Sequence, residues 1–181
     1  MNFTANADDL YDALRTAGRA RPTSSTMPIL EKVLLSRDGD TLRARCTNLE
    51  QHVEATLDAS LDDGPGGGPD EAALPYDRLT DTLKALPDIE VQVAVGPYYN
   101  ATLTTAQGTY EMRGSDGQDF PDFPEIEADT EISLRRAGLK DAVDTVSFAT
   151  ANDHLRPAML GALLEPVGSG SRVVATDGHR L

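Results

Sequence analysis

The sequence is short of several residue types, and each shortage excludes something. It contains no tryptophan and a single cysteine, Cys46, so the chain cannot form an internal disulfide. It has no apolar run near the roughly 20 residues that a membrane-spanning helix needs. Residues 1–4 also lack the basic and then apolar pattern of a secretion signal. We therefore expect a cytoplasmic protein, because thiols stay reduced there.

Basic residues are also scarce. The chain has 16 lysines and arginines against 30 aspartates and glutamates, which gives a net charge of −14. Taken as a whole, this argues against nucleic-acid binding, because phosphate contacts come from Lys and Arg. The charges are clustered, however, and binding depends on where the bases lie. Acids crowd residues 58–71 and 116–131, whereas Arg15, Arg19 and Arg21 lie on or just after the first predicted helix.

The patterns of common catalytic and metal sites are missing as well. The three histidines and Cys46 show no metal-ligand spacing. No serine stands in a nucleophile elbow, and no phosphate-binding Gly-rich loop follows a strand. Cys46 lies in an alternating run and is most simply a small core residue. We therefore expect no catalytic residue, no metal and no cofactor. One alternative stays open, because the carboxylate-rich run 116–129 could bind Ca²⁺ or Mg²⁺ through oxygen ligands.

An internal repeat is the most informative feature that is present. Several residues of the first part of the chain recur in similar form, each 129 positions later: Phe3 as Ile132, Leu10 as Leu139, Leu14 as Val143, Thr47 as Thr176 and Asn48 as Asp177. A fixed offset across several elements is the sign of a duplicated unit. The sequence therefore predicts one complete unit at residues 1–125 and the start of a second at residues 126–181.

Hydrophobic periodicity and turn residues predict an α+β unit. A first helix is capped by Asp8 and ends at Gly18, and a second spans 76–85. Strands are expected at 2–5, 29–36, 41–48, 51–59, 90–95, 101–105 and 108–113, with a Gly-rich loop at 62–69. The second unit restarts with a strand at 131–134, a helix at 136–146, and strands at 158–165 and 172–176.

A series of short motifs then suggests a family. They are Phe3-Thr4, Met27-Pro28-Ile29-Leu30 with Val33-Leu34-Leu35, Thr47-Asn48-Leu49-Glu50, Leu83-Lys84-Ala85-Leu86-Pro87, Asp119-Phe120-Pro121, Phe148-Ala149, Arg156-Pro157 with Gly161, and Ala175 to Leu181 (ATDGHRL). Each is weak alone, but their order and spacing over the whole chain resemble the bacterial sliding clamp, the beta subunit of DNA polymerase III.

The resemblance implies a fold and a function. In the clamp family, antiparallel sheets with two helices on the pore-facing side form a domain that occurs three times in each subunit. Two subunits close a homodimeric ring around double-stranded DNA. Such a ring is a non-catalytic processivity factor in DNA replication. This sequence holds no third domain and less than half of the second, so we expect an N-terminal piece of a clamp.

The resemblance also implies two sets of site residues. Bases on the pore helices would contact DNA phosphates, with Arg21 the best single candidate; the set is Arg15, Arg19, Arg21, Arg78, Lys84, Arg136 and Lys140. Asp77 and Asp153 stand where relatives often have basic or amide residues. A groove would bind a short peptide of the polymerase catalytic subunit or the clamp loader through Met159, Thr176, Gly178, His179, Arg180 and Leu181.

Interpretations without a binding function also remain open for both sets of residues. The basic residues are also what a solvated helix face carries, and residues 176–181 read as a simple turn. For the protein as a whole, the alternative function is a free-standing acidic domain that binds a protein or a cation and has lost ring assembly.

Overall fold

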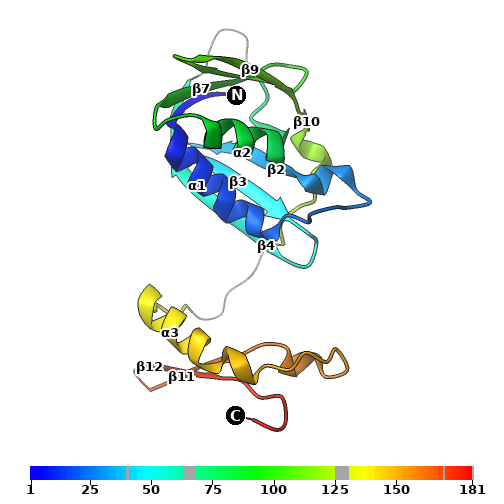
Figure 1. Ribbon diagram of the computed structural model, residues 1–181, viewed down its shortest axis with the longest axis vertical. Helices are drawn as coiled ribbons and strands as arrows, with labels where there is room; N and C mark the ends of the chain where they lie inside the picture. Colours follow the sequence, from blue (N-terminus) through cyan, green and yellow to red (C-terminus); the bar gives the residue numbers. More distant parts are fainter. Residues whose placement is uncertain (40, 63–67, 125–130, 169, 181) are drawn as a thin grey trace. The chain divides into compact units, whose positions relative to one another are not determined.

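The computed structural model describes residues 1–39, 41–62, 68–124, 131–168 and 170–180, and the chain divides into two compact units, Met1–Pro124 and Glu125–Leu181 (Figure 1). The elements of unit 1 are β1 (Asn2–Asn6), α1 (Ala7–Ala17), η1 (Gly18–Ala20), η2 (Pro28–Glu31), β2 (Lys32–Asp38), β3 (Thr41–Thr47), β4 (His52–Asp58), β5 (Ser60–Asp62), β6 (Glu71–Pro75), α2 (Tyr76–Ala85), β7 (Glu90–Val95), β8 (Asn100–Thr105), β9 (Gly108–Arg113), β10 (Ser115–Asp116) and η3 (Gly117–Asp119).

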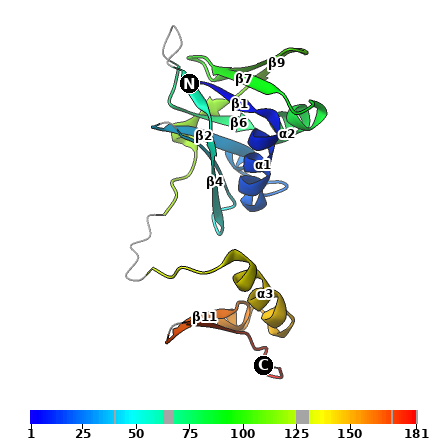
Figure 2. The same cartoon turned by 90° about the vertical axis from the view of Figure 1, so that its left-hand side faces the viewer.

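Unit 1 is built from two five-stranded antiparallel sheets. Their strand orders are β5-β1-β7-β8-β9 and β10-β6-β2-β3-β4. Helices α1 and α2 lie next to each other on one side of the unit (Figures 1 and 2). One apolar core joins the helices to both sheets, and Phe3, Leu14, Leu35, Leu79 and Val93 are among its fully buried members. The predicted α+β class with antiparallel sheets and two helices is confirmed.

Helix α1 begins two residues earlier than the sequence predicted. Its N-cap is Asn6, whose Oδ1 accepts hydrogen bonds from the backbone N–H groups of Asp8 and Asp9 at 2.9 and 3.3 Å. Asp8 is therefore not the N-cap. It is an acid in the first turn, where its charge interacts favourably with the positive end of the helix dipole. The predicted stripe is confirmed, because Leu10, Leu14 and Ala17 are all fully buried.

Four short elements of unit 1 differ from the prediction. Residues 28–31 form the 3-10 helix η2, and strand β2 follows only at Lys32. Residues 71–75, expected as a lead-in to the second helix, form strand β6 and pair antiparallel with β2. Strands β5 and β10 are two or three residues long and were not predicted. Strands β5, β6 and β10 exist because a distant strand supplies their ladder partners.

The segment after η3 is anchored to the outer face of a sheet. Phe120 is buried against Leu34 and Ala73, and Phe123 packs at the edge of the same cluster. The Phe123 ring also meets the His52 ring edge-on, with centroids 4.9 Å apart. This second, smaller core fixes the chain as it leaves unit 1.

Unit 2 contains α3 (Arg136–Val146), η4 (Ser147–Ala149), η5 (Pro157–Met159), β11 (Leu163–Val167) and β12 (Gly170–Val174). The predicted helix at 136–146 is confirmed. The predicted strand at 131–134 is absent, because those residues have no ladder partner in the described part of the chain. The strand expected at 158–165 is η5 followed by β11, and the strand expected at 172–176 starts and ends two residues earlier as β12.

The 129-residue offset recurs in three dimensions. Helices α1 and α3 begin and end 129 residues apart, and so do η1 and η4. The first residues of η2 and η5 are also 129 positions apart, as are those of β3 and β12. The turns after β3 and β12 share even their hydrogen bonds. Thr47 Oγ1 donates to the carbonyl of Gln51 at 2.9 Å, and Thr176 Oγ1 donates to the carbonyl of Arg180 at 2.5 Å. The repeat is therefore structural as well as sequential.

Burial separates the two units. Phe3, Leu10 and Leu14 are at most 1% exposed in unit 1, whereas their counterparts Ile132, Leu139 and Val143 are 39%, 39% and 42% exposed. Helix α3 has no buried residue. The same apolar pattern thus sits in a closed core in unit 1 and on an open surface in unit 2.

Two further sequence predictions concern burial. Cys46 is fully buried, and burial raises the pKa of its thiol to about 12. A thiol in that state is protonated at neutral pH and is not a nucleophile, so the core assignment is confirmed. Among the described helices, none combines the length and apolarity required to cross a membrane.

Candidate nucleic-acid interface

Helices α1 and α2 carry most of the predicted DNA-contacting residues of unit 1. Arg15 lies in the last turn of α1, Arg19 lies in η1, and Arg78 and Lys84 lie near the two ends of α2. All four side chains are exposed. Because α1 and α2 are neighbours on one side of the unit (Figure 2), the fold brings bases that are distant in sequence onto one side.

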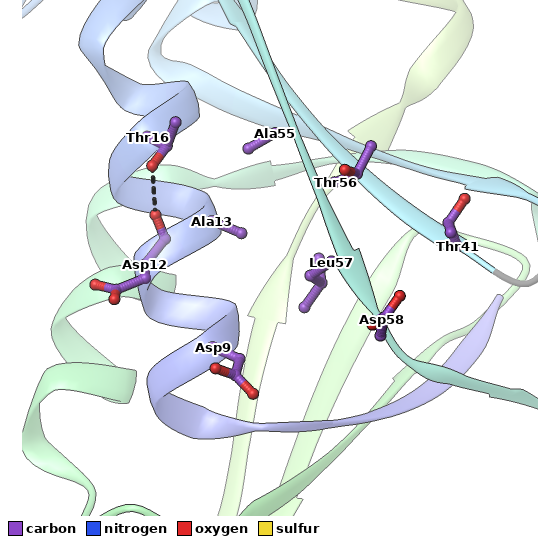
Figure 3. Close-up of a pocket in the computed structure, with 9 residues that line it drawn as sticks. All are labelled: Asp9, Asp12, Ala13, Thr16, Thr41, Ala55, Thr56, Leu57 and Asp58. Carbon is purple, nitrogen blue, oxygen red and sulfur yellow. Dashed lines mark hydrogen bonds between the residues drawn. The ribbon is translucent and has the colours of Figure 1, made fainter. Parts of the chain in front are cut away.

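The exposed face of α1 is divided by charge. Its first half lines a hollow of about 690 Å³ against β4, where Asp9 and Asp12 of the helix lie with Asp58 of the strand (Figure 3). Thr16 closes one side of this hollow and donates a hydrogen bond to the Asp12 carbonyl at 2.9 Å. Three carboxylates repel phosphate, so this half of α1 does not suit DNA.

The second half of α1 is basic. Arg15 and Arg19 line a separate hollow of about 260 Å³ together with Asp12 and Thr16. The Arg15 guanidinium lies 5.9 Å from the centroid of the Tyr11 ring, which orients it by a cation–π contact. The part of α1 that suits an anion is therefore the end nearest η1.

Arg21 differs from the other predicted bases. Its Nη2 lies 2.8 Å from Oδ1 of Asp77, and its side chain is only 14% exposed, against 70% for Asp77. The guanidinium also lies 4.6 Å from the centroid of the Tyr76 ring. Arg21 is thus held at the start of α2, and no local signal predicted this because the partners are 56 residues apart.

The remaining predicted bases lie further along α2 and on α3 of unit 2. Arg78 borders a hollow of about 580 Å³ on the sheet side of α2, which it shares with Asn100, Glu111 and Arg113. Arg136 and Lys140 are exposed on α3 in unit 2, where Lys140 pairs with Asp144. The structure therefore groups Arg15, Arg19, Arg21, Arg78 and Lys84 within unit 1 and leaves the α3 pair in the other unit.

The predicted peptide-binding residues lie in unit 2. Thr176 Oγ1 accepts from the N–H of Gly178 at 3.0 Å, and Asp177 Oδ1 accepts from the N–H groups of His179 and Arg180 at 2.9 and 2.8 Å. These bonds hold the pKa of Asp177 at about 2, helped by the Arg180 guanidinium.

Gly178 adopts a φ of 88°, which favours glycine. A Cβ atom there would lie 3.4 Å from Nη1 of Arg156, the N-cap residue immediately before η5. The turn is thus close to η5, which carries Met159. Leu181 lies outside the described residues.

The acidic run was the one candidate cation site. Residues 125–130 of that run lie outside the described part of the chain. Elsewhere, Asp116 Oδ1 accepts from the N–H of Gln118, a local turn contact. Within residues 1–39, 41–62, 68–124, 131–168 and 170–180, no three His, Cys, Asp or Glu side chains come together as metal ligands.

Comparison with known proteins identifies the family. Residues 1–124 match the family model of the DNA polymerase III beta subunit, N-terminal domain. The chain belongs to the DNA polymerase III beta subunit family. Among curated relatives, the beta sliding clamp of Synechocystis sp. is 29% identical over the whole chain and 47% of its own length. That of Pseudomonas aeruginosa is 31% identical over the whole chain and 48% of its length.

Solved structures of the beta subunit family share the fold. The crystal structure of the DNA polymerase III subunit beta from Pseudomonas aeruginosa superimposes with a TM-score of 0.86 at 28% identity, over 99% of this chain and 48% of that one. The clamp fold predicted from the motifs is confirmed. The chain spans about half the length of the relatives that it matches.

Proposed function

We propose that this protein acts as part of a sliding clamp, a non-catalytic processivity factor that encircles double-stranded DNA during replication. The observation that carries the proposal is the match of residues 1–124 to the beta subunit family, together with relatives named beta sliding clamp. Residues 1–125 would form the first clamp domain and residues 126–181 the start of a second. The site of action would be the cytoplasm.

The DNA contact would use the bases on the helices. In unit 1 these are Arg15, Arg19, Arg21, Arg78 and Lys84, and in unit 2 they are Arg136 and Lys140. Such side chains bind phosphates without reading bases, which suits a protein that moves along the duplex. The clustering of the unit 1 bases on neighbouring helices explains how a chain of net charge −14 can present a local basic surface.

Protein partners would be held elsewhere. We propose that Met159, Thr176, Gly178, His179, Arg180 and Leu181 contribute to a groove for short peptides of the polymerase III catalytic subunit and the clamp loader. The apolar Met159 would anchor a peptide side chain, and the exposed Arg180 would meet a carboxylate or a carbonyl. In the ring itself, the partner is a second copy of the subunit.

The direct test is DNA binding by the chain and by charge-reversed variants. We would follow ¹H–¹⁵N amide shifts while adding a short duplex at about 20 mM NaCl, because phosphate contacts weaken steeply with salt. Arg15→Glu should weaken binding and reduce the dependence of log K on log salt by about one contact. Shifted amides should fall on α1, η1 and α2.

Arg172→Glu is the matched control. It changes the charge by the same amount, and Arg172 is exposed on β12 of unit 2, outside the set of proposed contact residues. If Arg172→Glu weakens binding as much as Arg15→Glu, the helix bases are not the contact and the proposed interface is wrong.

A further inference from the structure

Arg21 lies in a preformed junction between the end of α1 and the start of α2. Tyr76, the first residue of α2, packs its ring against Gly18, where a Cβ atom would lie only 2.2 Å from the tyrosine hydroxyl oxygen. The Arg21 guanidinium lies over the same ring, 4.6 Å from its centroid. Gly18 thus makes room for Tyr76, and Tyr76 provides the surface on which Arg21 rests.

Asp77 completes this junction from the solvent side. It stands in the first turn of α2, which has no side-chain cap, and an acid there is favoured by the helix dipole. Its Oδ1 accepts one hydrogen bond from Nη2 of Arg21 at 2.8 Å. An arginine has five N–H donors, so this single bond leaves others for a second anion.

The position of Asp77 has an electrostatic consequence. Its side chain is 70% exposed, whereas that of Arg21 is 14% exposed, so an anion that approaches Arg21 meets the carboxylate first. Within the described part of the chain, no ion pair is formed by the other proposed DNA-contacting bases of α1, η1 and α2, which are Arg15, Arg19, Arg78 and Lys84. Arg21 is the member of the group whose charge is already matched by a carboxylate.

We propose that Asp77 competes with DNA phosphate for Arg21 and thereby lowers the affinity of the helix surface for the duplex. Asp77 keeps the guanidinium oriented on Tyr76 and at the same time offsets its charge. A phosphate that reaches Arg21 must share it with a carboxylate about 5 Å away, and their repulsion in water weakens binding by about threefold. This inference rests on the proposed DNA contact of α1 and α2.

The test compares two substitutions that remove the same charge from the same helix. Asp77→Asn keeps an oxygen that can accept from Arg21 but removes the negative charge. Asp81→Asn removes one exposed negative charge a single turn further along α2, where no contact with Arg21 occurs in the described structure. In the duplex titration at low salt, Asp77→Asn should bind about threefold more tightly than the natural chain, and Asp81→Asn should gain clearly less.

A double-mutant comparison then assigns the effect to Arg21. In an Arg21→Gln background, Asp77→Asn should gain no more than Asp81→Asn does, because the competed base is gone. The Arg21 Nε–H signal should stay shifted by the Tyr76 ring in Asp77→Asn, which verifies that the guanidinium keeps its place. Equal gains from the two aspartate variants, or weaker binding by Asp77→Asn, would overturn the proposal.

The outcome also separates this inference from the proposed function. If Arg15→Glu has no effect on duplex binding, the helix surface is not the DNA contact and both ideas fail. If Arg15→Glu weakens binding while Asp77→Asn matches Asp81→Asn, the DNA contact stands and the role of Asp77 alone is refuted.

Discussion

Truncation of equivalent leucines in the two units should have very different effects. Leu10 of α1 and Leu139 of α3 are related by the repeat, but Leu10 is fully buried and Leu139 is 39% exposed. Removing a fully buried leucine side chain costs about 3 to 4 kcal/mol, since both its burial and its packing are lost. The Leu139 side chain buries less apolar surface, so Leu139→Ala should lower the stability of unit 2 by about 1 kcal/mol and leave that of unit 1 unchanged.

The distribution of tyrosines makes this measurable without a label. All five tyrosines of the chain lie in unit 1, and there is no tryptophan. Tyrosine fluorescence in urea therefore reports the unfolding of unit 1 alone. With a urea dependence of about 1.5 kcal/mol per molar, Leu10→Ala should lower the midpoint by about 2 M.

Leu139→Ala serves as the matched control. It should leave the tyrosine midpoint unchanged and lower only the hydrogen-exchange protection of α3 amides. The reasoning is refuted if Leu139→Ala moves the tyrosine midpoint as far as Leu10→Ala does, because the units would then unfold together. It is also refuted if Leu10→Ala costs less than about 1 kcal/mol, which would mean that the core of unit 1 is not tightly packed around α1.

Three further predictions follow from local contacts. Asn6→Ala should lower the stability of unit 1 by about 1 kcal/mol in the same urea assay, whereas Asn6→Asp should retain it, because either oxygen-bearing side chain can cap α1. The pKa of Asp177 is lowered to about 2, so its turn gains stability that is complete above pH 4 and is lost as the pH falls through 2; the His179 and Arg180 amide shifts should titrate near pH 2, and a midpoint near 4 would contradict this. Burial and a pKa of about 12 should make Cys46 react with a thiol reagent only as fast as unit 1 opens, and reaction at the rate of a free cysteine at pH 8 would show that the site is accessible.

The parts of the fold that the sequence predicted correctly are those that depend on local pattern. The apolar spacing of Leu10 and Leu14 predicted α1, and the same spacing 129 residues later predicted α3. Helices depend on contacts within a few residues, so their pattern is visible in a short window. The longer strands of unit 1, such as β7, were visible because apolar and polar residues alternate along them.

The errors arose where a distant partner decides the structure. Residues 71–75 contain three buried apolar residues and end in Pro75, which did not read as a strand, but they pair with β2 from Lys32 to Ser36. Residues 131–134 carry the pattern of β1, and β1 is a strand because β5 and β7 pair with its two edges. In the described part of unit 2, β11 and β12 pair only with each other, so no such ladder forms.

The candidate site shows the same division. Sequence placed Arg15 and Arg78 on helices correctly, and their exposure follows from the burial of the opposite helix face. The ion pair that distinguishes Arg21 joins residues 56 positions apart, and nothing in the sequence around Arg21 encodes Asp77 as its partner. Which bases share a surface can therefore be inferred from pattern, but which of them is already neutralised requires the packed structure.

The repeat also separates structural from functional residues in the ATDGHRL motif. In the unit 1 turn, Asn48 Oδ1 accepts from the N–H groups of Glu50 and Gln51, as Asp177 Oδ1 does from those of His179 and Arg180. The hydroxyl of Thr176 likewise repeats the role of the Thr47 hydroxyl. The geometry of the turn thus accounts for the Thr176 hydroxyl and the Asp177 carboxylate. The turn does not require the side chain of His179, which is exposed. The similarity of Thr176 and Asp177 to sliding clamps is therefore evidence for the fold, and the case for a peptide site depends on His179 and its neighbours.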